Sequence, residues 1–379
     1  MSNKIKFLAY YLPQYHQIPE NDEWWGEGFT EWTNVKKAKP LFKGHQQPVI
    51  PGELGYYDLM KTQGIQEKQA NLAKEYGIDG FIYYSYWFGG GKMLLEKPAE
   101  KMLANKKVDL PFCFCWANET WSGVWHGLTN KILAEQQYLG EGDYTDYFNY
   151  LLPFFKDERY IKVDNKPMFH IYRIEDIPHS DNFLALFNKL AIENGFAGIY
   201  FIVTGNINSQ SNLNNSLVEG IVAIDTFKKL RYSQKVYFFE YYPGLFKWEK
   251  VVRYYLGLSS EVGVRKKPLK LNYSKGVKKM KINILNKKFI PCVIPNWDNS
   301  PRSGLKSLIL TNARPETFKK YMQKLLNEYV KFPANPPFIV IKSWNEWAEG
   351  NYLEPDKKYG TKWLEMIKKT KEEFSLLND

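Results

Sequence analysis

The sequence predicts an α/β protein that folds as a single (β/α)8 TIM barrel with loop insertions. Eight short apolar runs rich in β-branched and aromatic residues recur along the chain, and amphipathic helical patterns separate most of them. These runs are continuous rather than alternating, which is typical of parallel strands buried on both faces. A chain of 379 residues is long enough for one such barrel with insertions.

The expected strands occupy residues 6–11, 80–87, 111–116, 168–172, 198–204, 221–226, 289–294 and 338–343. The expected helices occupy residues 65–76, 94–103, 144–155, 183–194, 245–256, 316–329 and 362–374. Gly77 and Gly195 directly follow the first and fourth of these helices, as glycines often do at helix ends. The fifth connection, 206–217, is rich in Asn and Ser, so a helix there is doubtful.

A doubly wound sheet is the alternative fold, but no GxGxxG or GxxxxGK[ST] pattern follows any expected strand. Internal repeats and Pro/Ser-rich linkers are absent from the sequence, so residues 1–379 are expected to form one catalytic domain. Two stretches are too long for simple barrel turns. We therefore expect insertions at about 13–58, after the first strand, and at about 259–288, before the seventh.

Composition narrows the class of protein further. Hydrophobic residues make up 44% and charged residues 25% of the chain, which is typical of globular proteins. No apolar run is long enough to span a membrane, and the short N-terminal run FLAYYL does not resemble a secretory signal, so a cytoplasmic protein is expected. Three cysteines without a CxxC pair and five scattered histidines favour buried thiols and no bound metal; we expect no cofactor.

The net charge of +11 comes almost entirely from one segment, Arg265–Lys288, which holds ten basic residues and no acidic one. We expect a solvated excursion that does not contribute to the barrel core. A second interpretation is peripheral contact of 265–288 with an anionic membrane or a lipid-linked glycan, at the inner membrane face. Nucleic acid is disfavoured, because the segment has a single aromatic residue and no recognisable binding module.

Aromatic residues form 17% of the chain, with 12 Trp, 27 Tyr and 24 Phe. Many of the tryptophans lie close to Gly, Asn and Glu, an arrangement that suits stacking and hydrogen bonding in a sugar cleft; burial in the core is the alternative. Barrel active sites lie at the carboxyl ends of the strands. From those ends and their flanks, the candidate substrate-binding residues are Tyr11, His16, Trp32, Tyr84, Trp87, Trp116, Asn118, Glu119, Tyr172, Trp297, Asp298, Trp344, Asn345 and Glu354.

Glu346 and Glu349, in SWNEWAEGNYLEP after the last strand, are the candidate catalytic residues. If the chain turns helically after Trp344, both carboxyls face one side, about 5–6 Å apart at Cβ. That separation overlaps the roughly 5–5.5 Å between the carboxyls of retaining glycosidases. The alternative is an acidic first turn of a helix, stabilised by the helix dipole. We expect both carboxyls to share a cleft with Trp116, Glu119 and Trp297.

Long motifs give the chain a family resemblance. YYLPQYHQIPENDEWWGEGFTEW, FCFCWANETW, NWDNSPR and SWNEWAEGNYLEPDKKYG resemble the WbsX-type family, labelled glycosyltransferase and found in bacterial surface-polysaccharide loci. That family is similar to glycoside hydrolase family 99, the endo-α-mannosidases. The resemblance implies that Glu346 acts as a base on the 2-hydroxyl of the sugar and that Glu349 is the general acid/base. Ala348 and the WANE segment depart from the hydrolase pattern, so a mannose preference is not carried over.

The sequence thus predicts an enzyme that acts on glycosidic bonds of bacterial capsule or O-antigen polysaccharide, or of its precursors, with a retaining hydrolase-type site. The alternative is a glycosyltransferase that uses an activated or lipid-linked donor. The absence of an Asp-x-Asp motif counts against a nucleotide-sugar donor. A third hypothesis is a sugar-binding barrel without catalytic activity. The two carboxylates, Glu346 and Glu349, count against it.

Overall fold

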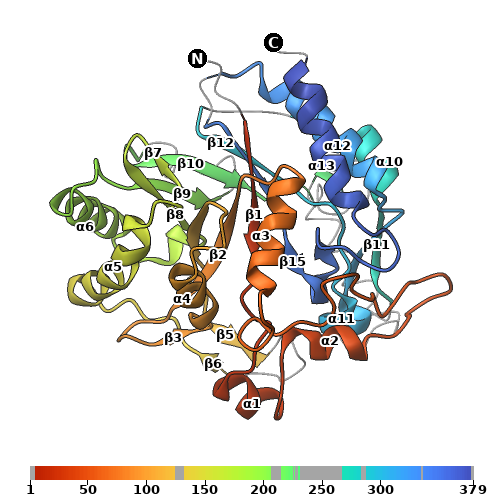
Figure 1. Cartoon of the computed structure of the whole chain (residues 1–379), viewed down its shortest axis with the longest axis horizontal. Coiled ribbons are helices and arrows are strands. Elements are labelled where there is room, and N and C mark those ends of the chain that lie inside the picture. The colour runs from red at the N-terminus through yellow and green to blue at the C-terminus, as the bar shows by residue number, and fades with distance from the viewer. Residues whose placement is uncertain are drawn as a thin grey trace, which may run out of the picture.

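The computed structural model describes residues 5–123, 132–205, 215–224, 226, 229–230, 267–282, 287–333 and 336–376. Within these residues, eight parallel strands form a closed barrel (Figure 1), which confirms the predicted fold. The barrel strands are β1 (Lys6–Tyr11), β2 (Gly80–Trp87), β4 (Phe112–Trp116), β8 (Lys166–Ile171), β9 (Tyr200–Thr204), β10 (Val218–Ala223), β12 (Phe289–Val293) and β14 (Phe338–Ile341).

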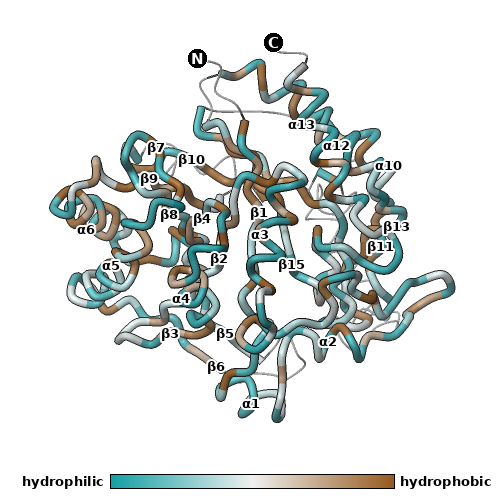
Figure 2. The backbone as a smooth tube through the Cα atoms, in the orientation of Figure 1, coloured by the Kyte–Doolittle hydropathy of each residue, from teal (hydrophilic) through white to brown (hydrophobic). Residues whose placement is uncertain are grey.

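Strand pairing closes the barrel at β1, which pairs in parallel with β14 on one side and with β2 on the other. Leu8, for example, lies opposite Val340 in one neighbour and Gly80 in the other. Nearly every residue of these strands is buried, as the continuous apolar runs predict. Figure 2 shows the corresponding hydrophobic colour on strands at the centre of the molecule.

Helices surround the strands, and most lie close to their predicted positions. They are α3 (Ile65–Glu75), α4 (Lys97–Ala104), α5 (Glu141–Lys156), α6 (Ser180–Glu193), α12 (Pro315–Tyr329) and α13 (Lys362–Leu376). The second begins later than predicted because Met93–Leu94 instead form β3, an antiparallel partner of β2. The expected helix at 245–256 lies outside the described residues, as does most of 206–217.

The stretch at 13–58 covers the carboxyl end of the barrel and carries two short helices, α1 (Pro19–Trp25) and α2 (Glu31–Lys37). Figure 1 places both helices at the end toward which β1 runs. Tyr15 and Trp32 are buried, and the Trp32 ring lies 5.5 Å from that of Trp347. This stretch therefore packs directly on the turn that follows the last barrel strand.

The basic segment is only partly what we expected. Leu269–Asn272 form β11, which pairs in parallel with β13 (Leu308–Thr311), and Tyr273–Lys279 form the helix α10. Tyr273 is fully buried and donates a hydrogen bond to the Ile294 carbonyl at 2.6 Å. The expectation of an excursion outside the core is therefore wrong for the described part, because Leu271 of β11, Tyr273 and Val277 of α10, and Met280 are buried, while the lysines between them are exposed.

Short elements complete the described chain. They are β5 (Trp121–Ser122), β6 (Ile132–Ala134), β7 (Lys162–Val163), β15 (Asn345–Glu346), β16 (Asn351–Tyr352), α11 (Ser300–Ser303), and the 3₁₀ turns η2 (Ile174–Asp176), η3 (Gly304–Lys306) and η4 (Trp347–Glu349). Cys113, Cys115 and Cys292 are buried thiols, as predicted. Among the described residues, no helix is long and apolar enough to cross a membrane.

Candidate active site

A cleft of about 320 Å³ opens at the carboxyl ends of the barrel strands. Its walls come from the ends of β1, β2, β4, β8 and β14, and from α1, α2 and α11. The lining residues are Leu12, Gln14, Asn21, Trp25, Glu31, Tyr84, Tyr86, Ala117, Glu119, Thr120, Trp121, Ser122, Leu133, Tyr172, Arg302, Lys342, Glu346 and Glu349. A cleft of this size, with aromatic walls and convergent charges, is typical of a small-molecule or saccharide site.

The turn after β14 brings Glu346 and Glu349 into this cleft. Glu346 ends the short strand β15, and Glu349 ends the 3₁₀ turn η4 that follows it. Gly350 then reverses the chain in a left-handed conformation with φ of 57°. The helical turn therefore begins at Trp347, after the short strand β15, and not directly after Trp344 as expected. Both carboxyl groups nevertheless line one cavity rather than opposite faces.

Lys342 lies between the two carboxyls. Its ammonium nitrogen is 2.7 Å from Glu346 Oε2 and 3.8 Å from Glu349 Oε2. These two oxygens are consequently no more than the sum of those distances, 6.5 Å, apart. The upper limit admits the roughly 5–5.5 Å separation of retaining glycosidases.

Arg302 of α11 approaches Glu349 from the other side. Its guanidinium donates to Glu349 Oε1 at 2.8 Å and to Glu31 Oε1, on α2, at 2.7 Å. Glu31 is almost fully buried. One arginine thus ties the stretch at 13–58 to the turn that carries Glu349, and it holds the carboxyl of Glu349 in one orientation.

The charged groups around the two glutamates differ, and they affect the pKa of Glu349. Burial, followed by the negative charge of Glu346, raises the pKa of Glu349 from 4.5 to about 7, although Arg302 and Lys342 act in the opposite direction. Glu346 has its own ammonium partner, Lys342, at 2.7 Å. Near neutral pH, Glu349 can therefore hold a proton.

Aromatic rings form much of the remaining wall. Tyr84 stacks on Tyr10 with ring centroids 5.2 Å apart and planes within 1° of parallel. Tyr86 meets Trp121 edge to face at 5.0 Å. These contacts lock the rings into fixed positions, so the cleft presents rigid apolar surfaces next to charged groups. Such surfaces suit the C–H faces of a sugar ring.

Several predicted site residues are buried and do not line the cleft. The hydroxyl of Tyr11 donates to Gln69 at 2.8 Å, and His16 Nδ1 lies 3.0 Å from the Pro13 carbonyl. Trp32 donates its indole N–H to the Tyr57 carbonyl at 2.7 Å. Their positions near a strand end in the sequence made these residues candidates, but these contacts are all made inside the protein.

A second group lies behind the cleft wall at β2 and β4. Trp87 stacks on Tyr147 at 4.9 Å, and Trp116, expected to line the cleft, is fully buried and donates to the Trp87 carbonyl at 2.9 Å. Asn118 bonds to the backbone N–H and carbonyl of Arg173, whose side chain pairs with Glu119 at the cleft. Asn118 is therefore placed to support the wall rather than to contact a substrate.

A third group packs against the turn at 345–350, which carries Glu346 and Glu349 and is proposed below to be catalytic. Trp344 is fully buried, and its backbone N–H donates to the Tyr10 carbonyl. Asn345 exchanges two hydrogen bonds with the backbone of Leu12. Glu354 is fully buried and accepts from Trp347 Nε1 at 2.6 Å and from Gln69 Nε2 at 2.7 Å. Burial raises its pKa to about 7.

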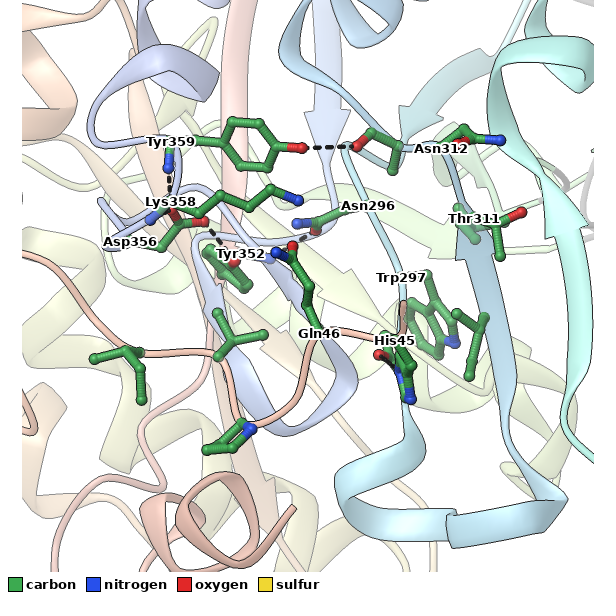
Figure 3. A pocket seen from close by; sticks show the side chains of 18 of the residues that line it. His45, Gln46, Asn296, Trp297, Thr311, Asn312, Tyr352, Asp356, Lys358 and Tyr359 are labelled. Carbon is green, nitrogen blue, oxygen red and sulfur yellow. Dashed lines mark hydrogen bonds and ion pairs between the residues drawn. The ribbon is translucent and has the colours of Figure 1, made fainter. Parts of the chain in front are cut away.

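Trp297 and Asp298 line a different cavity, which shares no lining residue with the cleft. Figure 3 shows this second cavity with Trp297 on one wall. The two spaces are adjacent, because Lys342 Nζ lies 5.7 Å from the centroid of the Trp297 ring. The expectation that Trp297 shares the cleft of Glu346 and Glu349 is therefore wrong, whereas Glu119, Tyr84 and Tyr172 do line it.

Sequence reasoning missed three charged residues of the cleft: Lys342, Arg302 and Glu31. The signal for Lys342 was a lysine inside an otherwise apolar strand run, PFIVIKSW. Arg302 and Glu31 stand in the motifs NWDNSPR and GFTEW, but nothing in a linear pattern pairs residues 271 positions apart.

Comparison with known proteins places the chain in a family. Residues 7–367 match the family described as "Glycosyltransferase WbsX", and the chain belongs to it. A relative in Xanthomonas campestris pv. campestris strain B100, "Uncharacterized protein WxcX", is 32% identical over 362 residues, which is 94% of this chain and 48% of the relative. The chain thus spans about half the length of the curated relatives it matches.

Solved structures share the fold at low identity. The GH99 endo-alpha-mannosidase from Bacteroides thetaiotaomicron is 14% identical with a TM-score of 0.57, over 100% of this chain and 99% of that one. A protein described as "Glycoside hydrolase-like protein" is 13% identical with a TM-score of 0.54, over 97% of this chain and 94% of that one. These likenesses show a common barrel architecture.

Proposed function

We propose that this protein is a carbohydrate-active enzyme that acts on glycosidic bonds of bacterial surface polysaccharide, capsule or O-antigen, or of its precursors, by a retaining mechanism. Membership of the WbsX family and the glycosidase-like barrel support the broad class. The observation that carries the finer proposal is the pair of carboxyls, Glu346 and Glu349, which share one lysine, together with the raised pKa of Glu349.

In this proposal Glu349 is the general acid. A carboxyl with a pKa of about 7 is about half protonated at neutral pH, so it can give a proton to the departing glycosidic oxygen. Once the leaving group has gone, the same carboxylate can accept a proton from the incoming hydroxyl. Arg302 acts as a positioning residue, since its contact with Glu349 Oε1 directs the other carboxyl oxygen into the cleft.

Glu346 is the second participant, and its carboxyl lies 2.7 Å from the ammonium nitrogen of Lys342. It acts as the base on the 2-hydroxyl of the sugar, in line with the family-99 resemblance. Alternatively, it acts as the nucleophile that attacks the anomeric carbon. In either case the product keeps the anomeric configuration of the substrate. The aromatic walls at Tyr84, Tyr86 and Trp121 support binding of an oligo- or polysaccharide substrate.

The test is incubation with a panel of defined oligosaccharides and lipid-linked glycans, followed by mass spectrometry. Cleavage or transfer is expected for the wild type, with Glu349→Gln slower by about 10²–10⁴-fold and Glu346→Gln comparably slower. Glu53→Gln, at an exposed carboxyl away from the cleft, is the matched control and should retain full rate. Near-normal turnover in both cleft variants would place the catalytic groups elsewhere.

A glycosyltransferase that uses an activated or lipid-linked donor is the second candidate, favoured by the family description. The same panel separates the two, because a transferase extends an acceptor and a hydrolase releases a reducing end. Peripheral contact with an anionic membrane at its inner face is compatible with α10, whose Lys275, Lys278 and Lys279 are exposed. Salt-sensitive co-sedimentation with anionic but not neutral vesicles tests that contact, and a variant with these lysines changed to Glu should lose it.

A further inference from the structure

The second cavity, which Trp297 lines, has the size and the lining of a binding site. It encloses about 460 Å³, within the roughly 300–1,000 Å³ typical of small-molecule sites. Its walls come from the end of β12, from β13, and from the segments at 42–50 and 356–359. Figure 3 shows polar and aromatic side chains from all of these segments directed into one space.

The acidic groups of this cavity are already occupied by partners within the protein. Asp298 Oδ2 lies 2.6 Å from His45 Nε2 and accepts from Gln47 at 2.7 Å. Asp356 accepts from the Tyr352 hydroxyl at 2.7 Å and from the backbone N–H of Lys358 at 2.8 Å. The hydrogen-bonding capacity of both carboxylates is largely used, so they are poorly placed to bind a ligand hydroxyl or cation.

The lysines of this cavity, in contrast, have no acidic partner among the described residues. Lys357, Lys358 and Lys270 lie in or beside the cavity, and none of them forms an ion pair within the part of the chain that the structure describes. Lys358 Nζ is held 4.5 Å from the centroid of the Tyr359 ring, and Figure 3 shows its side chain extending across the cavity toward Asn296. Asn296 accepts from the backbone N–H of Tyr352 through its amide oxygen, which leaves the amide nitrogen as a donor.

We propose that this cavity binds a sugar residue that carries an anionic group, either a carboxylate or a phosphate. The anionic group pairs with Lys358 and accepts from Asn296, while Trp297 supplies an aromatic surface for the ring. Gly350, the residue directly after Glu349, lines the same cavity. The occupant would therefore lie against the back of the catalytic turn. The proposal rests on the proposed function only in taking the ligand to be a saccharide.

Binding is measured by isothermal titration calorimetry at about 0.15 M salt, where the Debye length is about 8 Å. The probes are methyl glucuronide, glucose 1-phosphate, methyl glucoside and inorganic phosphate. The protein is the full chain carrying Glu349→Gln, which binds without turnover, so a failed activity assay does not affect the result. One or both anionic sugars should bind at least about tenfold more tightly than methyl glucoside, or about 1.4 kcal/mol.

Variants then assign the binding to the cavity. Lys358→Gln should remove most of the preference for the anionic sugar, and Lys358→Arg should retain it. Lys362→Gln, at a nearby exposed lysine, should leave it unchanged. Tighter binding of glucuronide than of the phosphate sugar identifies a uronate site, and the reverse identifies a sugar-phosphate site. The proposal is overturned if methyl glucoside or inorganic phosphate binds as well as both anionic sugars, if no probe binds, or if Lys358→Gln has no effect.

Discussion

Lys342 should control the protonation of Glu349, and replacing it with methionine tests that control. Methionine keeps most of the side-chain volume but removes the ammonium 3.8 Å from Glu349 Oε2. Two unit charges about 4 Å apart attract by about 4 kcal/mol at an effective dielectric constant of about 20. Because Arg302 remains and water can enter, we expect roughly a third of this, which raises the pKa of Glu349 by roughly one unit.

Carbon-13 NMR of labelled glutamate carboxyls measures this shift without any substrate. The signal of Glu349 is identified by its loss in Glu349→Gln, and its titration is then followed in the wild type, in Lys342→Met and in Lys342→Arg. The midpoint should lie near 7 in the wild type, higher in Lys342→Met and almost unmoved in Lys342→Arg. A midpoint that stays the same or falls in Lys342→Met would refute the charge arrangement described for the cleft.

Three further changes test the surroundings of the turn. Glu31→Gln should lower the pKa of Glu349, because the Glu31 charge raises it; the same titration shows this, and an upward shift would contradict it. Gly350→Ala should cost about 1–3 kcal/mol in denaturant unfolding, since its φ is 57° and the added Cβ would lie 2.8 Å from the Asp298 backbone nitrogen; an unchanged midpoint would argue against this packing. The raised folded-state pKa of Glu354 means that its stabilising contribution is complete below about pH 4.5 and is lost as the pH rises through about 7. Glu354→Gln should therefore flatten the fall in the free energy of unfolding over that range, by at most on the order of 3 kcal/mol, and an equally steep fall would contradict this.

The barrel could be predicted from the sequence because strands that are buried on both faces consist of continuous runs of apolar residues. The shared orientation of Glu346 and Glu349 could also be predicted, since it depends on one local turn. The identity of the wall residues could not. Trp116 and Tyr86 both lie at strand ends, yet one is fully buried in the core and the other lines the cleft. Which of them faces the cleft depends on neighbouring elements that are distant in sequence.

The burial of residues in the basic segment, 265–288, was not predicted from the sequence either. Its ten positive charges predicted a solvated loop, but Leu271 and Tyr273 between the lysines are fully buried. Charge density describes the exposed face of such a segment, whereas the spacing of its few apolar residues decides whether it folds. The positions of the apolar residues, considered apart from the charges, predict a short amphipathic helix at Tyr273–Lys279.

Two kinds of contact hold the turn that carries Glu346 and Glu349, and they have different roles. Asn345 and Glu354 are fully buried; Asn345 bonds to the backbone of Leu12, and Glu354 accepts from Gln69 and Trp347. Lys342 and Arg302 contact the carboxyls themselves. Substitutions of Asn345 or Glu354 should therefore lower stability and move the whole turn, while substitutions of Lys342 or Arg302 should alter the proton affinity of the carboxyl with the fold intact. A pKa measurement can thus separate the proposed acid–base role of Glu349 from the structural support of the turn.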